Sequence, residues 1–228
     1  MIEVHDKRHR SCLPAWNWPW WKPPSPAPAQ RTVQASLTEL VAPRTYFDTP
    51  IYMMVLQRYP WLVTLMLIQS TSGMIVERFE NLIQQHVILA SFLTMLVGGG
   101  GNSSGQTVAE LVKRLGMGEV RSDDLCRVLR KEVAIGLFLS LGLGVVAFPR
   151  VRYLAKSATD LDAAAIALSY CLIVVVANSI GVVVVMVLHR CKMAAVGSPP
   201  VVQVVVDVTG TAITMVVANA VLGVAKGE

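Results

Sequence analysis

The chain has 228 residues, of which 54% are apolar and only 15% are charged, and its formal net charge is +5. Its mean hydropathy is +0.53. A soluble domain carries roughly 25% charged residues, and a soluble globule with this composition would expose very large apolar patches. The composition therefore excludes an ordinary soluble domain and predicts an integral membrane protein in a lipid bilayer. Basic loops beside the membrane explain the positive charge, and no nucleic-acid-binding signature is present.

The first 58 residues differ from the rest of the chain. Residues 1–36 begin with a basic run and continue as LPAWNWPWWKPPSPAPAQ, whose prolines exclude a helix or a central strand. We interpret them as a disordered Trp- and Pro-rich tail. Residues 37–58 are amphipathic and are interrupted by Pro43 and Pro50, which predicts a linker or interfacial helix along the membrane surface. Residues 59–228 then form the membrane domain.

Five apolar segments follow, at about 60–76, 87–111, 133–148, 163–188 and 201–224. The first and third are short, since a helix needs about 20 residues to cross the hydrocarbon core. The valine runs near 182–188 and 201–208 would suggest strands in water. An isolated strand in lipid leaves its backbone polar groups unpaired, so we expect helices instead. The sequence predicts an all-α fold with five transmembrane helices.

The distribution of Lys and Arg predicts the orientation of these helices. Most of them lie before the first span and in the loops at 113–131 and 189–199, and few lie in the remaining loops. Short loops rich in Lys and Arg stay on the side from which the protein is inserted. This places the N-terminus inside and the C-terminus outside, in a plasma membrane or an organelle membrane.

Asp207 is the most informative polar residue, because it lies within a run of valines in the fifth span. A carboxylate at the centre of a membrane helix costs about 2.5–3.5 kcal/mol on insertion scales, and it is kept where it meets a partner, water or an ion. No Lys or Arg lies within the apolar spans to neutralise it. We favour an ion pathway, with a protonated or helix-pairing Asp as the structural alternative.

Four further residues are candidates for the same site. Gly210 and Thr211 follow Asp207 by three and four residues, so the three share one side of the helix. Asn178 lies in the fourth span, where an interhelical hydrogen bond is the alternative to a ligand. Asn102 follows four consecutive glycines in the second span. The glycines permit either close approach of another helix or a broken helix with exposed carbonyls.

A hydrated magnesium ion suits this set of residues. Magnesium takes oxygen ligands, keeps several of its waters and touches only one or two carboxylates. One acid per subunit, doubled by a two-fold axis, meets that need. Zinc and copper prefer Cys and His, which the spans largely lack.

Five segments carry a family resemblance: TPIYMMVLQRYPWL at 49–62, RFE at 78–80, GGN at 100–102 with Gln106, Ala177 and Asn178 with Gly181, and SPPVVQVVVDVTG at 198–210. From about 49 to 223 the sequence resembles the membrane domain of the MgtE magnesium transporter and channel family, which is related to the eukaryotic magnesium solute carriers. The resemblance implies five spans, a homodimer, a pore on its two-fold axis and a central ion-binding Asp, here Asp207.

The sequence departs from the family in three ways. The pattern GGNxGNQ has Ser104 and Gly105 at its third Gly and second Asn, and Val204 and Val206 replace polar residues before the Asp. Bacterial members also carry large magnesium-sensing cytoplasmic modules, which the 58 residues before the first span are too short to hold. We therefore expect gating by such a sensor to be absent or supplied by another chain.

The hypothesis that follows is magnesium transport down the electrochemical gradient through a dimeric pore. One alternative is a structural or assembly subunit that does not transport, and another is a transporter of cobalt, manganese or zinc. We do not expect an enzyme, because no nucleophile and base are arranged for catalysis in the sequence.

Overall fold

The computed structural model describes residues 49–155, 158–191 and 197–224, so the predictions for the tail at 1–36 and for residues 37–48 lie outside the described residues. The chain divides into two compact units between Met54 and Val55, and the helical bundle is the second unit. In the described ranges the secondary structure is helical, and five helical stretches are long and apolar enough to cross a membrane. The prediction of an all-α fold with five spans is confirmed.

The spans are longer than the apolar segments that predict them. The second is α5 (Val87–Gly116), the third α6 (Leu125–Leu154), the fourth α7 (Asp160–Arg190) and the fifth α8 (Ser198–Val224). The short helix η2 (Ser122–Asp124) precedes α6. The third span exceeds its predicted length by the most, because α6 begins in the charged segment before residue 133 and continues past Pro149. Hydropathy marks only the apolar middle of such a helix.

The first span consists of α2 (Ile51–Gln69) and α3 (Thr71–Arg78), which a turn at Ser70 separates. Three successive hydroxyls, those of Ser70, Thr71 and Ser72, donate to the carbonyl three residues earlier at 2.6–2.7 Å. Such bonds compete with the helical ladder and bend or interrupt a helix. α2 begins well before the predicted start at residue 60 and includes residues 51–58, which the sequence assigned to the linker.

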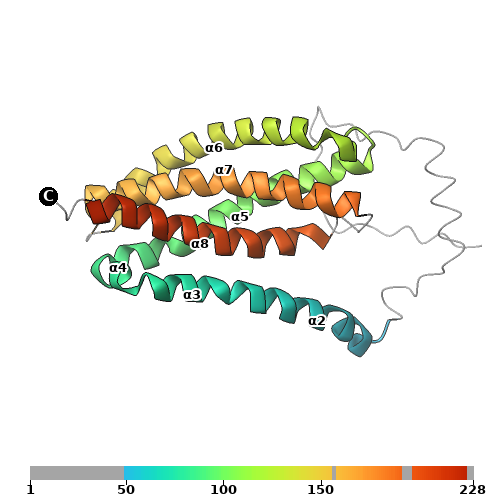
Figure 1. Cartoon of the computed structure of the whole chain (residues 1–228), viewed down its shortest axis with the longest axis horizontal. Helices are drawn as coiled ribbons and strands as arrows, with labels where there is room; N and C mark the ends of the chain where they lie inside the picture. The colour runs from blue at the N-terminus through green and yellow to red at the C-terminus, as the bar shows by residue number, and fades with distance from the viewer. Residues whose placement is uncertain (1–48, 156–157, 192–196, 225–228) are drawn as a thin grey trace, which may run out of the picture. The chain divides into compact units, whose positions relative to one another are not determined.

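The fourth span, α7, is the centre of the bundle and packs against α5, α6 and α8 (Figure 1). Its fully buried side chains include Ile166, Ile173 and Val182. In the most apolar stretch of each span, 44% of the residues of α7 and α8 are buried, against 6% for the first span. α3 lies beside α8, and α4 (Glu80–Gln85) leads back into α5. The first span is therefore a peripheral helix of this bundle.

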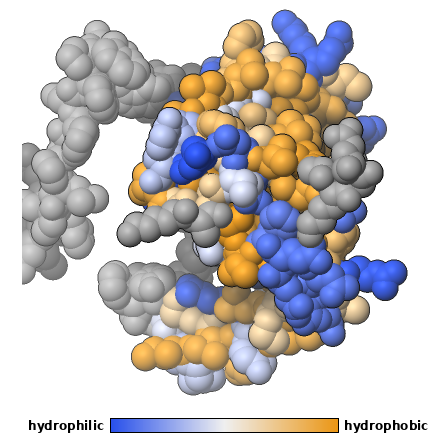
Figure 2. All heavy atoms as spheres, turned by 90° about the vertical axis from the view of Figure 1, so that its left-hand side faces the viewer, coloured by the Kyte–Doolittle hydropathy of each residue, from blue (hydrophilic) through white to orange (hydrophobic). Residues whose placement is uncertain are grey.

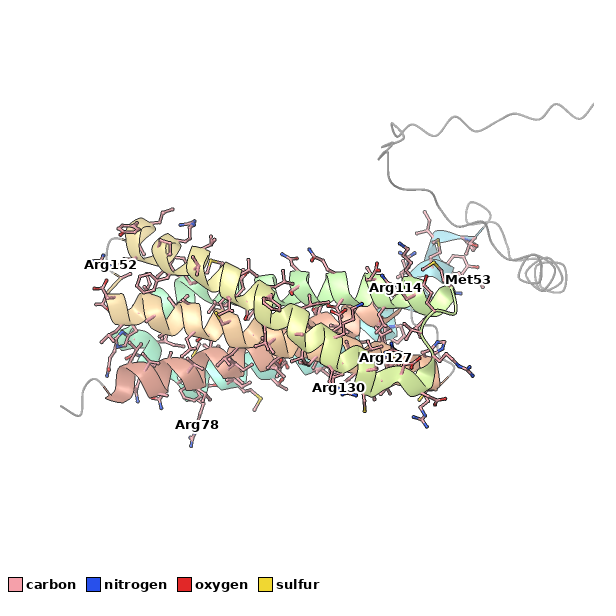
Figure 3. All side chains as sticks on the ribbon, turned by 90° about the horizontal axis from the view of Figure 1, so that it is seen from above. Met53, Arg78, Arg114, Arg127, Arg130 and Arg152 are labelled. Atoms are coloured by element: carbon pink, nitrogen blue, oxygen red, sulfur yellow. The ribbon has the colours of Figure 1, made fainter. Side chains whose placement is uncertain are left out.

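Charged and apolar side chains are separated along the bundle. Arg114 and Arg127 lie toward one end and Arg152 toward the other (Figure 3), while apolar side chains such as Phe138 and Val145 are more than 70% exposed along the middle of α6. Seen from the α4 end, hydrophobic residues reach the outer surface on several sides (Figure 2). Such a surface suits lipid.

The start of α7 is held by a buried acid. Asp162 is 3% exposed, and its carboxylate accepts from the backbone N–H (3.0 Å) and hydroxyl (2.7 Å) of Thr159 and contacts His86 Nδ1 at 2.8 Å. We expect Asp162→Ala to lower the free energy of unfolding by about 1–3 kcal/mol, because it removes the carboxylate half of the capping box and takes this partner from the Thr159 N–H and the His86 ring. Thermal unfolding in detergent measures this.

The control for this prediction is Asp160→Ala. Asp160 is exposed and pairs with Arg152, and a surface ion pair contributes about 0–1 kcal/mol. Equal destabilisation by the two variants would contradict a special role for Asp162.

Candidate cation-binding site

Asp207 lies within α8, and its side chain is half-buried. It lines a pocket of about 330 Å³ whose walls come from the end of α2, the start of α3, the first half of α5 and α8; the lining residues are Gln69, Ser72, Leu93, Thr94, Val97, Gly98, Gln203, Asp207 and Thr211. Six of these nine residues have polar side chains, and a seventh, Gly98, has none. The pocket is therefore a polar indentation between otherwise apolar helices.

Two glutamine amides hold the carboxylate. Gln203 Nε2 donates to Asp207 Oδ1 at 2.7 Å, and Gln69 Nε2 donates to Oδ2 at 2.7 Å. The ion pairs found among the described residues do not include Asp207. Neutral amides stabilise the carboxylate but leave its net charge in place, so the pocket attracts cations.

The structure brings two of the five predicted site residues together. Thr211 lines the same pocket as Asp207, and its hydroxyl donates to the Asp207 backbone carbonyl at 2.8 Å. Gly210 is buried instead, where a Cβ would meet Val97 and Ile173 at 3.4 and 3.7 Å. These are ordinary van der Waals distances, so Gly210 lies on a packed face of α8 outside the pocket lining.

Asn102 and Asn178 lie elsewhere. Asn102 is exposed on α5 and does not line the pocket. Asn178 is 1% exposed on α7, and its Oδ1 accepts from Ser103 of α5 at 2.7 Å. Asn178 thus forms the interhelical hydrogen bond that was the alternative to a ligand.

The glycine run in α5 permits close packing without breaking the helix, because α5 is continuous from Val87 to Gly116. A Cβ at Gly99 would overlap Tyr170, one at Gly100 would meet Ile173 at 2.5 Å, and one at Gly101 would overlap the Gln203 amide. Close approach of other helices is therefore the correct alternative for this run, and the broken helix is wrong.

Sequence reasoning missed Gln69 and Gln203. Gln203 carries a usable signal, since it is the polar residue four positions before Asp207 in a valine-rich helix. Gln69 carries no such signal, because it is 138 residues away along the chain.

A second pocket, of about 320 Å³, lies between the end of α5 and the start of α6. Its Arg114 already pairs with Glu110 at 2.6 Å and Glu119 at 2.8 Å. These charges compensate one another and are nearly half exposed. We regard the Asp207 pocket as the functional candidate, since its charge is uncompensated inside an apolar helix.

The polar contact between α5 and α7 yields a stability prediction. Asn178 Nδ2 has no hydrogen-bond partner among the described residues, so the bond from Ser103 to Oδ1 is the one that this amide makes there. We expect Ser103→Ala to lower the free energy of unfolding by about 0.6 kcal/mol and at most about 1.7 kcal/mol, the average and the maximum for interhelical hydrogen bonds in a membrane protein. Unfolding in detergent measures it.

Ser91→Ala is the matched control, because Ser91 is exposed and bonds only within its own helix. The Ser103 effect should also shrink in an Asn178→Leu background, where no amide remains to be satisfied. Equal losses in Ser91→Ala and Ser103→Ala would argue against the interhelical bond.

Five helical stretches of membrane length, three of which line a carboxylate pocket, define a multi-pass integral membrane protein with a polar site inside its spans. The model of the MgtE family, described as divalent cation transporters, matches residues 93–217. The chain belongs to this family.

Two relatives resemble most of the chain. It is 27% identical over 175 residues to the magnesium transporter MgtE of Bacillus subtilis, and the aligned region covers 76% of this chain and 38% of that protein. It is 31% identical over 168 residues to the magnesium transporter MgtE of Thermus thermophilus, and the aligned region covers 73% of this chain and 37% of that protein. The chain therefore spans less than two fifths of the length of these relatives.

Proposed function

We propose that this protein carries magnesium ions across a membrane through the Asp207 pocket. The observation that carries the proposal is a carboxylate within an apolar helix whose hydrogen-bond partners are neutral amides. Membership of a family of divalent cation transporters and similarity to two proteins named magnesium transporters support the choice of ion.

The chemistry of the pocket suits a hydrated ion. Among the described residues no three His, Cys, Asp or Glu side chains gather into a metal-binding cluster. A cation at Asp207 would therefore meet one carboxylate together with amide and hydroxyl oxygens, the ligands that magnesium accepts while it keeps its waters. Six waters occupy about 180 Å³ at about 30 Å³ each, and the pocket of about 330 Å³ has room for them.

We further propose that two copies of the chain pair so that their Asp207 pockets face each other across a two-fold axis. The half-buried carboxylate lies at the surface of a single copy, and a charge at membrane depth needs protein or water around it. A mass of two chains in detergent and in lipid discs is the expected result. A stable monomer in both would contradict the pairing.

The membrane potential supplies the driving force in this proposal. Each charge that crosses gains about 2.3 kcal/mol per 100 mV, so a divalent ion gains about 4.6 kcal/mol. Proteoliposomes with an imposed inside-negative potential should take up magnesium without ATP, at a rate that rises with the potential. Protein-free liposomes are the control, and no uptake at any potential would contradict the proposal.

The same assay separates magnesium from other divalent cations, which the broader family description includes. We expect magnesium to enter in preference to zinc and cobalt, since the pocket offers oxygen ligands and lacks Cys and His. Manganese also takes oxygen ligands, so its uptake is measured against that of magnesium in the same assay. Preferential entry of one of the other ions would reassign the cargo.

A further inference from the structure

The two glutamines beside Asp207 occupy both of its oxygens from different parts of the chain. Gln203 lies one turn earlier on α8 and donates to Oδ1, while Gln69 ends α2 and donates to Oδ2, each at 2.7 Å. A hydrogen bond from an amide to a carboxylate is charge-assisted and is stronger than a neutral one. Both donors therefore stabilise the ionised carboxylate.

Amide donors and a cation compete for this carboxylate. The N–H groups point their positive ends at the oxygens, where a cation or its bound waters would bind. The terminal torsion of a glutamine has a broad, two-fold profile. Half a turn about it replaces the amide nitrogen by the amide oxygen, which accepts hydrogen bonds from the waters of a hydrated cation.

We propose that Gln69 and Gln203 form a carboxamide clamp that sets the affinity of Asp207 for a hydrated divalent cation. The amide nitrogens hold the carboxylate in competition with the cation, and they turn away or leave when the cation binds. This inference rests on the proposed function, because it assigns the two glutamines a role at the same site.

The fold positions both halves of the clamp. A Cβ at Gly101 would overlap the Gln203 amide, so the missing side chain on α5 makes room for it. Gln69 lies directly before the turn at Ser70, where side-chain hydroxyls interrupt the helical ladder. Cation binding at Asp207 would then release a bond between the first span and α8, which couples occupancy of the site to the α2–α3 turn.

The test compares Gln203→Met and Gln69→Met with Gln84→Met. Methionine keeps the length of the side chain and removes the donor. Gln84 lies on α4, bonds Glu80 and does not line the pocket. We expect the half-saturating magnesium concentration for uptake to fall about fivefold or more in the first two variants, in keeping with the loss of a charge-assisted bond that competes with the ion, and to stay unchanged in the third.

Two further measurements test the clamp independently of the glutamine substitutions' effect on uptake. Gly101→Ala should lower the half-saturating concentration in the same direction as Gln203→Met, because its methyl group displaces the Gln203 amide. Magnesium should also raise hydrogen exchange at residues 70–78 in the wild type. In Gln69→Met that exchange should be high without magnesium.

The outcomes separate the clamp from the transport proposal. If Asp207→Asn abolishes uptake while both glutamine variants keep or raise the wild-type half-saturating concentration, the clamp is overturned and transport stands. If the wild type shows no uptake, the transport proposal is overturned, and the hydrogen-exchange measurement then tests the clamp by itself. A magnesium effect on residues 70–78 that Gln69→Met removes supports it, and the absence of any magnesium effect overturns it.

Discussion

Asp207→Asn should reduce magnesium uptake into proteoliposomes at least about tenfold, the factor that corresponds to 1.4 kcal/mol. The substitution keeps the shape of the side chain and removes its charge. At about 5 Å and an effective dielectric constant of about 20, a carboxylate attracts a divalent ion by roughly 6–7 kcal/mol. A quarter of this attraction already exceeds the roughly 1.4 kcal/mol that corresponds to a tenfold loss of uptake, so the prediction holds even after strong screening by solvent.

Asp160→Asn is the matched control for this prediction. It removes the same charge at the exposed start of α7, outside the pocket, and uptake should remain near the wild-type rate. Incorporation into the liposomes must be equal for the three proteins. Wild-type uptake by a well-incorporated Asp207→Asn variant would mean that the carboxylate serves only to hold α8 to the first span.

The second large effect concerns the contact of α5 with α7 and α8. A Cβ at Gly100 would lie 2.5 Å from Ile173 Cγ2, 3.2 Å from Val206 Cγ1 and 3.6 Å from Ala177 Cβ. We expect Gly100→Val to lower the free energy of unfolding by about 1–3 kcal/mol or more, since overpacking forces the helices apart. Thermal unfolding in detergent measures the loss.

Gly105→Ala is the control within the same helix. No atom lies within 4 Å of a Cβ built at Gly105, and alanine in a helix is favoured over glycine by about 0.5–1 kcal/mol. This variant should therefore unfold at the wild-type temperature or above it. A comparable loss in both variants would mean that any added carbon harms α5, whatever its neighbours.

The two effects are separable in one set of proteins. Gly100→Val should lower stability and uptake together, because Val206 precedes the carboxylate on α8 and would be displaced. Asp207→Asn should lower uptake with a smaller change in melting temperature than Gly100→Val, because it keeps the side-chain shape and weakens only the bonds from Gln69 and Gln203.

The lipid environment, the class of fold and the presence of an acid in the fifth span all follow from the amino-acid sequence alone. An apolar segment long enough to cross a membrane is a helix and not an isolated strand, and the reason is local. In lipid, each segment must pair its own backbone N–H and C=O groups. Asp207 stands out for an equally local reason, since a charge among valines is costly without a partner. The five helices are therefore readable from the amino-acid sequence, and the role proposed for Asp207 starts from the same local argument.

The residues that surround this acid become known only when the helices are packed together. Helical periodicity places Thr211 beside Asp207, but it cannot show that Asn102 is exposed, or that Asn178 is buried against Ser103. Gln69 reaches Asp207 because α3 packs on α8, a contact between segments far apart in the sequence. Likewise, whether four glycines break a helix or admit its neighbours depends on the side chains of α7 and α8 that fill the space beside them.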